Sequence, residues 1–202
     1  ERDRSGIVAH HFCRKALPGA KSVIKIFSPF RIETPFPWML KSESFGMGKK
    51  KAEQFAHELE GCSYETILVI GSSGALRPHL KPGDTFFVSE IVSEAETIKI
   101  PQRFSGPSAR LYTSARIIAD PNEKIQISER LNADIVDMEM GFLWTAASES
   151  LRKKFVFVRG VLDASGHELD FKKASTWLRL PGQIHRYRSG MRSFLRDYIF
   201  RR

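Results

Sequence analysis

The sequence has only two cysteines, no long apolar run and no low-complexity tract, and each absence excludes a class of protein. Cys13 and Cys62 are too few for a disulfide framework, and no Cys-x-x-Cys spacing indicates a zinc site. No apolar stretch approaches the roughly 18 residues that a membrane span needs. The pattern of a secretory signal peptide is also absent. We therefore expect a cytoplasmic protein in a reducing setting, without a metal centre.

Flexible linkers and internal repeats are absent as well, which bears on the domain organisation. The 202 residues are enough to bury one sizeable core. Short apolar runs alternate with helical patterns, and this alternation is typical of an α/β fold. We expect a single domain over residues 1–202 that ends in a basic amphipathic helix at about 183–202.

Acidic residues are scarce at the C-terminal end. The chain carries a formal net charge of +9, and residues 172–202 contribute +8 of it, with Asp197 as their one acid. Apolar residues recur there at helical spacing: Ile184, Tyr187, Met191, Phe194, Leu195, Tyr198 and Ile199. Either this stripe packs on a sheet with the arginines in solvent, or the helix makes peripheral contact with an anionic membrane surface. Nucleic acid is not an expected partner, because no nucleic-acid-binding motif accompanies the charge.

The apolar patterns also give an order of secondary-structure elements. Strands are predicted at residues 6–9, 22–27, 38–41, 66–70, 85–92, 111–118, 134–136 and 155–161. Helices are predicted at residues 49–59 and 138–152, from Asp120 onward and from Gln183 onward. Three features predict that a helix starts at Asp120: Asp120 is a favourable N-cap residue, a proline follows it, and Glu123 lies three positions after the cap. The run 66–70 lacks polar alternation, which favours a strand buried on both faces.

Three predicted strand ends carry residues that could bind a ligand, as strand ends often do in α/β sheets. They are the run 71–76, the junction Asp137 to Glu139, and Asp163. Taken alone, each has an ordinary structural interpretation: a tight turn, a helix cap and the start of a turn.

Together, four blocks of sequence resemble the nucleoside phosphorylase and nucleosidase superfamily in order and spacing. They are Gly46-Met47-Gly48-Lys49, Gly71-Ser72-Ser73-Gly74-Ala75-Leu76, Val136-Asp137-Met138-Glu139 and Val158-Arg159-Gly160-Val161-Leu162-Asp163. The resemblance covers residues 38–163, and the stretch 115–138 is most similar to the hopanoid-associated phosphorylase-like branch. It implies a three-layer α/β/α sandwich around a mixed central sheet, and a homo-oligomer, dimer or higher. It also implies an enzyme that cleaves the N-glycosidic bond of a purine nucleoside-like substrate by phosphorolysis or hydrolysis.

The resemblance gives the matching residues their roles. Glu139 would hold the ribose 2′- and 3′-hydroxyls with Met138 packed against the sugar, and Asp163 would be the general acid to the base. The loop expected against sugar and base consists of Ser72, Ser73 and Gly74. These roles agree with the chemistry, because a carboxylate stabilises an oxocarbenium-like sugar. The acid must carry a proton, so we expect burial to raise the pKa of Asp163.

Phosphate is a candidate co-substrate, and no other cofactor is implied. Arg14 and Gly46 are its candidate ligands, since a guanidinium can bind phosphate bidentately. The other interpretation of His10, His11 and Arg14 is that they are solvated or core-edge residues. Arg159, within the last predicted strand, is expected in a structural ion pair.

Departures from the superfamily's pattern keep a second hypothesis open. No acidic residue that could activate water follows the first predicted strand, and Leu162 stands where the superfamily has a serine before the acid. Phe104 and Tyr112 are the candidates for an aromatic that stacks on the base. The alternative function is therefore a degenerate member that binds a nucleoside-like ligand without turnover.

Overall fold

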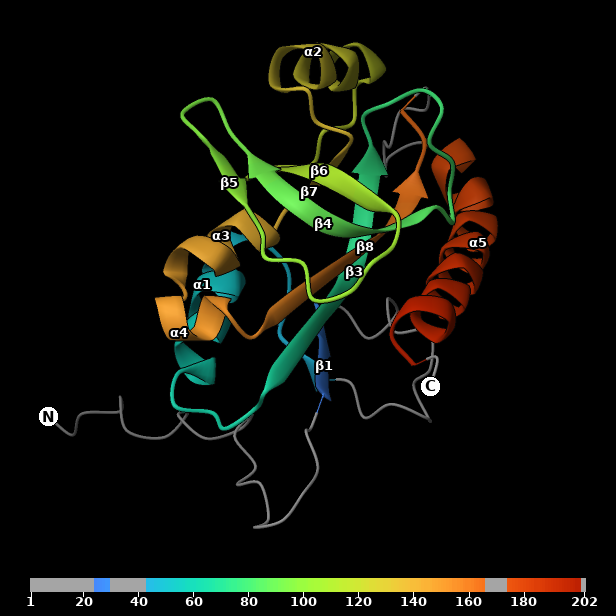
Figure 1. Ribbon diagram of the computed structural model, residues 1–202. Helices are drawn as coiled ribbons and strands as arrows, with labels where there is room; N and C mark the ends of the chain where they lie inside the picture. The colour runs from blue at the N-terminus through green and yellow to red at the C-terminus, as the bar shows by residue number, and fades with distance from the viewer. Residues whose placement is uncertain (1–23, 30–42, 166–173, 201–202) are drawn as a thin grey trace, which may run out of the picture.

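A mixed β-sheet with helices on both faces forms the protein (Figure 1). The computed structural model describes residues 24–29, 43–165 and 174–200, and for 174–178 it describes the backbone alone. Its strands are β1 (Ile24–Ser28), β2 (Glu43–Ser44), β3 (Thr66–Ala75), β4 (Thr85–Val92), β5 (Thr97–Lys99), β6 (Ser108–Thr113), β7 (Ile135–Asp137) and β8 (Phe155–Asp163). Its helices are α1 (Lys49–Leu59), α2 (Pro121–Leu131), α3 (Met140–Ala146), α4 (Glu149–Arg152) and α5 (Ala174–Tyr198).

The two long strands β3 and β8 run parallel to each other through the middle of the sheet. β4 pairs antiparallel with β8 and parallel with β6, and β6 pairs parallel with β7. β7 returns to β3, antiparallel, at Gly74 and Ala75, so five strands close into a ring. On the same edge of β3, β1 pairs with the first half of the strand and β7 pairs with its end. The prediction of a mixed central sheet is confirmed.

Successive residues of β3 face two separate apolar cores. Ile67 and Val69 belong to a cluster that contains residues of α1 and α3, whereas Leu68 and Ile70 belong to a cluster that contains residues of α5. Figure 1 shows α1, α3 and α4 on one side of β3 and β8, and α5 on the other. The uninterrupted apolar run of β3 therefore reflects burial on both faces, as predicted.

Helix α5 packs its apolar stripe on the sheet, which supports the first of the two interpretations of the basic tail. Tyr187, Met191 and Leu195 are buried in the cluster that they share with β3 and β8. The close approach requires Gly160 of β8, since a Cβ there would lie 2.6 Å from Cε2 of Tyr187. The helix begins at Ala174, earlier than predicted, because it continues through Pro181. A proline inside a helix costs a hydrogen bond, but packing can offset that cost.

We expect Gly160→Ala to lower the free energy of unfolding by about 1–3 kcal/mol, because the added methyl overpacks the contact with the Tyr187 ring. Chemical denaturation would measure the change. Gly182→Ala is the control. Gly182 lies in α5, the helix that carries Tyr187, and nothing lies within 4 Å of a Cβ at that position. The control should be neutral or stabilising by up to about 1 kcal/mol. Equal effects of the two substitutions would contradict this account of the packing.

Several predicted boundaries are wrong. The expected helix 138–152 is two helices, because Ala147 is extended and the Ser148 hydroxyl accepts the N–H of Leu151 at 3.3 Å to start α4. The expected strand 111–118 is displaced to β6, and β5 is an additional short strand. The expected loop 72–74 belongs to β3, where it pairs with β8.

Some predictions fall outside the described residues: the strands at 6–9 and 38–41, and the side chains of His10, His11 and Arg14. No helix in the described part of the chain is both long and apolar enough to cross a membrane.

Candidate active site

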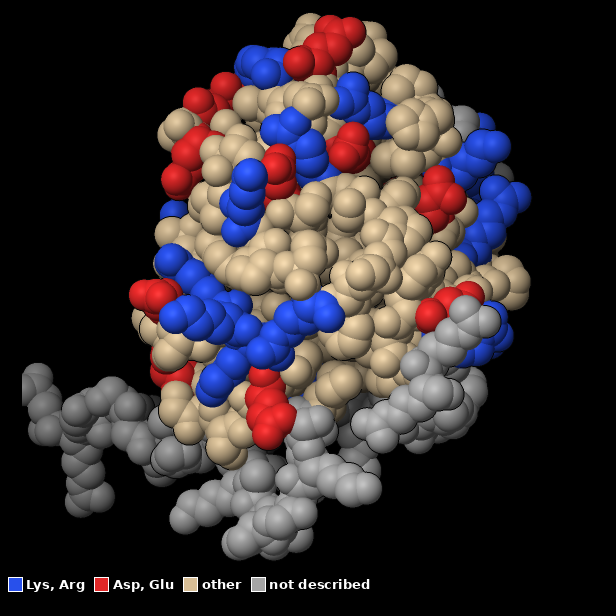
Figure 2. Space-filling model, viewed as in Figure 1, with Lys and Arg blue, Asp and Glu red and all other residues tan. Residues whose placement is uncertain are grey.

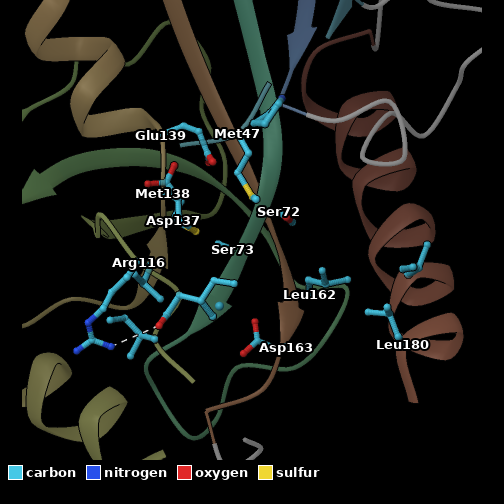
Figure 3. A pocket seen from close by; sticks show the side chains of 16 residues that line it. Met47, Ser72, Ser73, Arg116, Asp137, Met138, Glu139, Leu162, Asp163 and Leu180 are labelled. Carbon is cyan, nitrogen blue, oxygen red and sulfur yellow. Dashed lines mark hydrogen bonds between the residues drawn. The ribbon is translucent and has the colours of Figure 1, made fainter. Parts of the chain in front are cut away.

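A cavity of about 270 Å³ opens where β3, β7 and β8 end (Figure 3). Its volume lies close to the lower end of the range of about 300–1,000 Å³ for small-molecule sites. Its described lining is mostly apolar and consists of Pro29, Met47, Ser72, Ser73, Gly74, Arg116, Ile117, Ile118, Val136, Asp137, Met138, Glu139, Leu162, Asp163, Leu180 and Ile184. The structure thus brings the three predicted strand ends together around one cavity.

Glu139 lies at the junction between β7 and α3, where it is the N-cap residue of α3. Its side chain is buried, and its Oε1 accepts the backbone N–H of Gly48 at 3.0 Å. Gly48 caps α1 with φ +82°, a conformation that suits glycine. The carboxylate of Glu139 is therefore held by a backbone donor next to the N-terminus of α1, an end of a helix that favours negative charge.

Asp137 fixes this junction from the other side. Its carboxylate accepts hydrogen bonds from the Thr113 hydroxyl at 2.7 Å, the Met140 N–H at 3.1 Å and Arg159 Nε at 2.9 Å. Arg159 Nη2 also lies 2.9 Å from Asp137, and neither side chain is exposed to solvent. The expected structural ion pair of Arg159 is confirmed, and its partner is the acid two residues before Glu139.

Asp163 is the last residue of β8 and is buried, across the cavity from Glu139 (Figure 3). It pairs with Gly74 of β3 in the sheet, and a Cβ on Gly74 would lie 3.0 Å from its Oδ1. Lys124, which is fully buried on α2, donates to Oδ2 of Asp163 and, at 3.3 Å, to the carbonyl of Ala164. The ammonium favours the ionised carboxylate, which opposes the expectation that burial alone keeps Asp163 protonated.

The remaining predicted residues divide into two groups. Ser72, Ser73, Gly74 and Met138 line the cavity, although the Ser73 hydroxyl is within hydrogen-bond distance of the Gly160 carbonyl at 3.2 Å. Gly46 lies outside the described lining, and its N–H donates to the Pro29 carbonyl at 3.1 Å. Phosphate binding by Gly46 and by Arg14 stays a prediction. No three His, Cys, Asp or Glu side chains among the described residues come together as metal ligands.

Sequence reasoning missed the residues that cover the cavity. The segment after β6 contributes Arg116, Ile117 and Ile118, and α5 contributes Leu180 and Ile184. A hydrogen bond from Arg116 to Glu123 raises the pKa of that exposed arginine and ties the segment to the first turn of α2. Lys124 carried a signal that could have been used: helical spacing places it on the same face as Ile127.

Neither aromatic proposed for stacking on the base lines the described part of the cavity. Phe104 stacks on Phe87 with ring centroids 5.9 Å apart, in the core that α5 covers. Tyr112 packs against the small apolar cluster that contains Ile127 of α2. The position of Phe104 or Tyr112 in the sequence does not show which rings or side chains it packs against, so it could not identify the residue that stacks on a base.

No protein-family model matches the chain, and no curated protein matches it. Among solved structures, a 5′-methylthioadenosine/S-adenosylhomocysteine nucleosidase from Helicobacter pylori, in complex with butyl-thio-DADMe-Immucillin-A, is 14% identical with a TM-score of 0.65, over 86% of this chain and 97% of that one. Futalosine hydrolase of Helicobacter pylori is 12% identical with a TM-score of 0.67, over 86% and 97%. The corresponding nucleosidase of Campylobacter jejuni is 16% identical with a TM-score of 0.63, over 85% and 100%. At these identities the similarity shows that the chain has the same fold as these nucleosidases and futalosine hydrolase.

Proposed function

We propose that this protein cleaves the N-glycosidic bond of a purine nucleoside-like substrate. The observation that carries the proposal is a pair of buried carboxylates, Glu139 and Asp163, that line one cavity from the ends of different strands. The solved structures of similar fold are nucleosidases and a futalosine hydrolase, which supports a reaction at an N-glycosidic bond.

In this proposal Glu139 binds the ribose 2′- and 3′-hydroxyls. Its carboxylate is anchored by Gly48 and stays next to the sugar as positive charge develops at C1′, where an anion stabilises the transition state. Asp163 hydrogen-bonds the base and delivers the proton that the leaving base needs. Met138 and the Ser72–Gly74 segment of β3 pack against the substrate between the two acids.

The attacking nucleophile is an oxygen of water or of phosphate. Its new bond to C1′ forms as the electron pair of the C1′–N bond moves to the base, and a water nucleophile gives up one of its two protons to the solvent. Phosphate is the co-substrate if Arg14 and Gly46 bind an anion, as the sequence suggests, and hydrolysis follows if they do not. The similar solved structures are named as nucleosidases and a futalosine hydrolase, which favours hydrolysis.

A second candidate function is ligand binding without turnover, and the contact between Lys124 and Asp163 is the observation that favours it. An ionised Asp163 can accept a hydrogen bond from a base but has no proton of its own to give. The catalytic proposal therefore needs a source for that proton.

Base release separates the two functions. Purified protein is incubated with adenosine, inosine or methylthioadenosine, with and without phosphate, and the free base is quantified. We expect base release from at least one nucleoside, and a phosphate requirement would select phosphorolysis. Saturable binding of the nucleosides with no base released from any of them would establish the second candidate and reject the first.

We also propose that the chain forms a dimer or higher oligomer and makes a peripheral contact with a membrane. The solvent side of α5 supports the membrane contact, because Arg179, Arg186, Arg192 and Arg196 are exposed on it. Figure 2 shows basic side chains along the edge of the molecule where α5 lies. The apolar stripe of the same helix is already used on the sheet, so such a contact would be mainly electrostatic.

A further inference from the structure

The contact between Lys124 and Asp163 is the feature that the proposed roles do not explain. The Lys124 side chain has no solvent exposure, and that of Asp163 is 8% exposed. Taking an ammonium and a carboxylate out of water is unfavourable for each ion, so such groups are retained in a protein interior when they compensate each other. The pair adjoins the cavity, and Asp163 lines it.

The elements on both sides of the ion pair hold the Asp163 carboxylate in place. Lys124 reaches Asp163 from α2, whose start is set by Asp120: its carboxylate accepts the Asn122 N–H at 2.8 Å. On the opposite side, a Cβ on Gly74 would lie 3.0 Å from Oδ1 of Asp163, so the glycine leaves room for the carboxylate. The carboxylate is thus held between a fixed cation and a strand that lacks a side chain at that point.

We propose that Lys124 is a positioning residue that keeps Asp163 ionised in the unliganded protein and supplies, through Asp163, the proton for the leaving base. This inference rests on the proposed function for its last step. The ionised carboxylate is a hydrogen-bond acceptor only, so the site selects a base edge that presents an N–H donor, such as a 6-amino group. A base with a carbonyl oxygen at that edge binds more weakly, because the carbonyl and the carboxylate are both acceptors and no hydrogen bond forms between them.

The proton transfer balances within the pair. Lys124 Nζ first transfers its proton to the Asp163 carboxylate, with which it is in contact. As the C1′–N bond breaks, its electron pair moves to the base, and the carboxyl group of Asp163 passes this same proton to a base nitrogen. The base leaves neutral, Asp163 is again a carboxylate, and Lys124 is left as a neutral amine. Lys124 Nζ is the donor in contact with the Asp163 carboxylate, so the transfer needs no movement of the helix. Water restores the proton after the products leave.

The test uses free bases, which cannot be turned over. Calorimetry measures the dissociation constants of adenine and hypoxanthine with the wild type, Lys124→Met and Lys153→Met. Hydrogen bonds to charged groups contribute enough that we expect the wild type to bind adenine at least about tenfold more tightly than hypoxanthine. In Lys124→Met the buried carboxyl takes up a proton and becomes a donor, so the ratio should fall to about threefold or less. Lys153→Met, which removes an exposed lysine paired with Glu149, should keep the wild-type ratio.

An unchanged ratio in a folded Lys124→Met protein that binds adenine would overturn the proposal. Infrared difference spectra between wild type and Asp163→Asn at neutral pH give a second measurement, which needs neither a ligand nor the Lys124 variant. A carbonyl band of a protonated carboxyl in the wild type would overturn the proposal, and its absence would support an ionised Asp163. If the wild type binds neither base, the proposed function fails, whereas the infrared result still decides the charge of Asp163.

Discussion

Asp163→Asn is expected to reduce base release by about 10²–10⁴-fold, the typical contribution of general acid–base catalysis. An amide has nearly the shape of the carboxyl group, and it can still accept a hydrogen bond from Lys124. It cannot pass a proton from Lys124 to the base, so the bond-breaking step loses its acid. Binding depends on the shape of the cavity and should change much less. Initial rates of base release and dissociation constants for a nucleoside would give the two effects separately.

Two further variants isolate the cause of that loss. Asp134→Asn changes a carboxylate that pairs with Arg77 and lies outside the described cavity lining, and it should keep nearly wild-type turnover. The double variant Lys124→Met/Asp163→Asn replaces the ion pair by neutral groups and should be as inactive as Asp163→Asn. Normal turnover in Asp163→Asn, with the variant folded, would remove Asp163 from the proposed mechanism.

The sequence predicted the elements whose signals are local. α1 and β4 have the predicted bounds, because helical spacing in one and a strand pattern in the other end at clear turns. The start of α2 is also as predicted, since Asp120 caps it and Pro121 follows at the first helical position. In each of these, the residues that decide the structure lie within a few positions of one another.

The strand β3 shows why other features could not be predicted. Glycines and serines after an apolar run indicate a turn, yet Gly71 and Gly74 continue the strand. They lie opposite Arg159 and Asp163 in the register with β8. A Cβ at Gly71 would lie 3.1 Å from Arg159 Nη1, as one at Gly74 would crowd Asp163. These glycines are required by side chains of a strand nearly 90 positions further along the sequence, which a local pattern does not contain.

The same limit applied to the candidate site. The motif order located Glu139 and Asp163 on one cavity, because strand ends meet at one edge of the sheet. The charge on Asp163 depends on Lys124, which is 39 positions away and lies on a different element. The resemblance suggested a role for Asp163 from its position in the motif. Its protonation state, however, depends on neighbours that only the fold brings together.

Arg159→Met is expected to lower the free energy of unfolding by about 3–5 kcal/mol, because it leaves the carboxylate of Asp137 buried without its cation. Both side chains are fully buried, and Arg159 Nη1 also donates to the carbonyls of Val69 at 3.3 Å and Val158 at 3.2 Å. Denaturant unfolding would measure the change. Arg196→Met is the matched control, since its partner Asp197 is exposed and such pairs contribute about 1 kcal/mol or less.

The double variant Arg159→Met/Asp137→Asn tests whether the loss comes from the unpaired charge. An amide at position 137 can still accept from Thr113, and no charge is left buried, so the double variant should be more stable than Arg159→Met alone. Because Asp137 also accepts the N–H of Met140, its displacement would move the junction that presents Glu139. Arg159→Met should therefore weaken nucleoside binding as well as stability, and the double variant should recover part of both. Equal stability of Arg159→Met and Arg196→Met would show that the buried pair does not hold this junction.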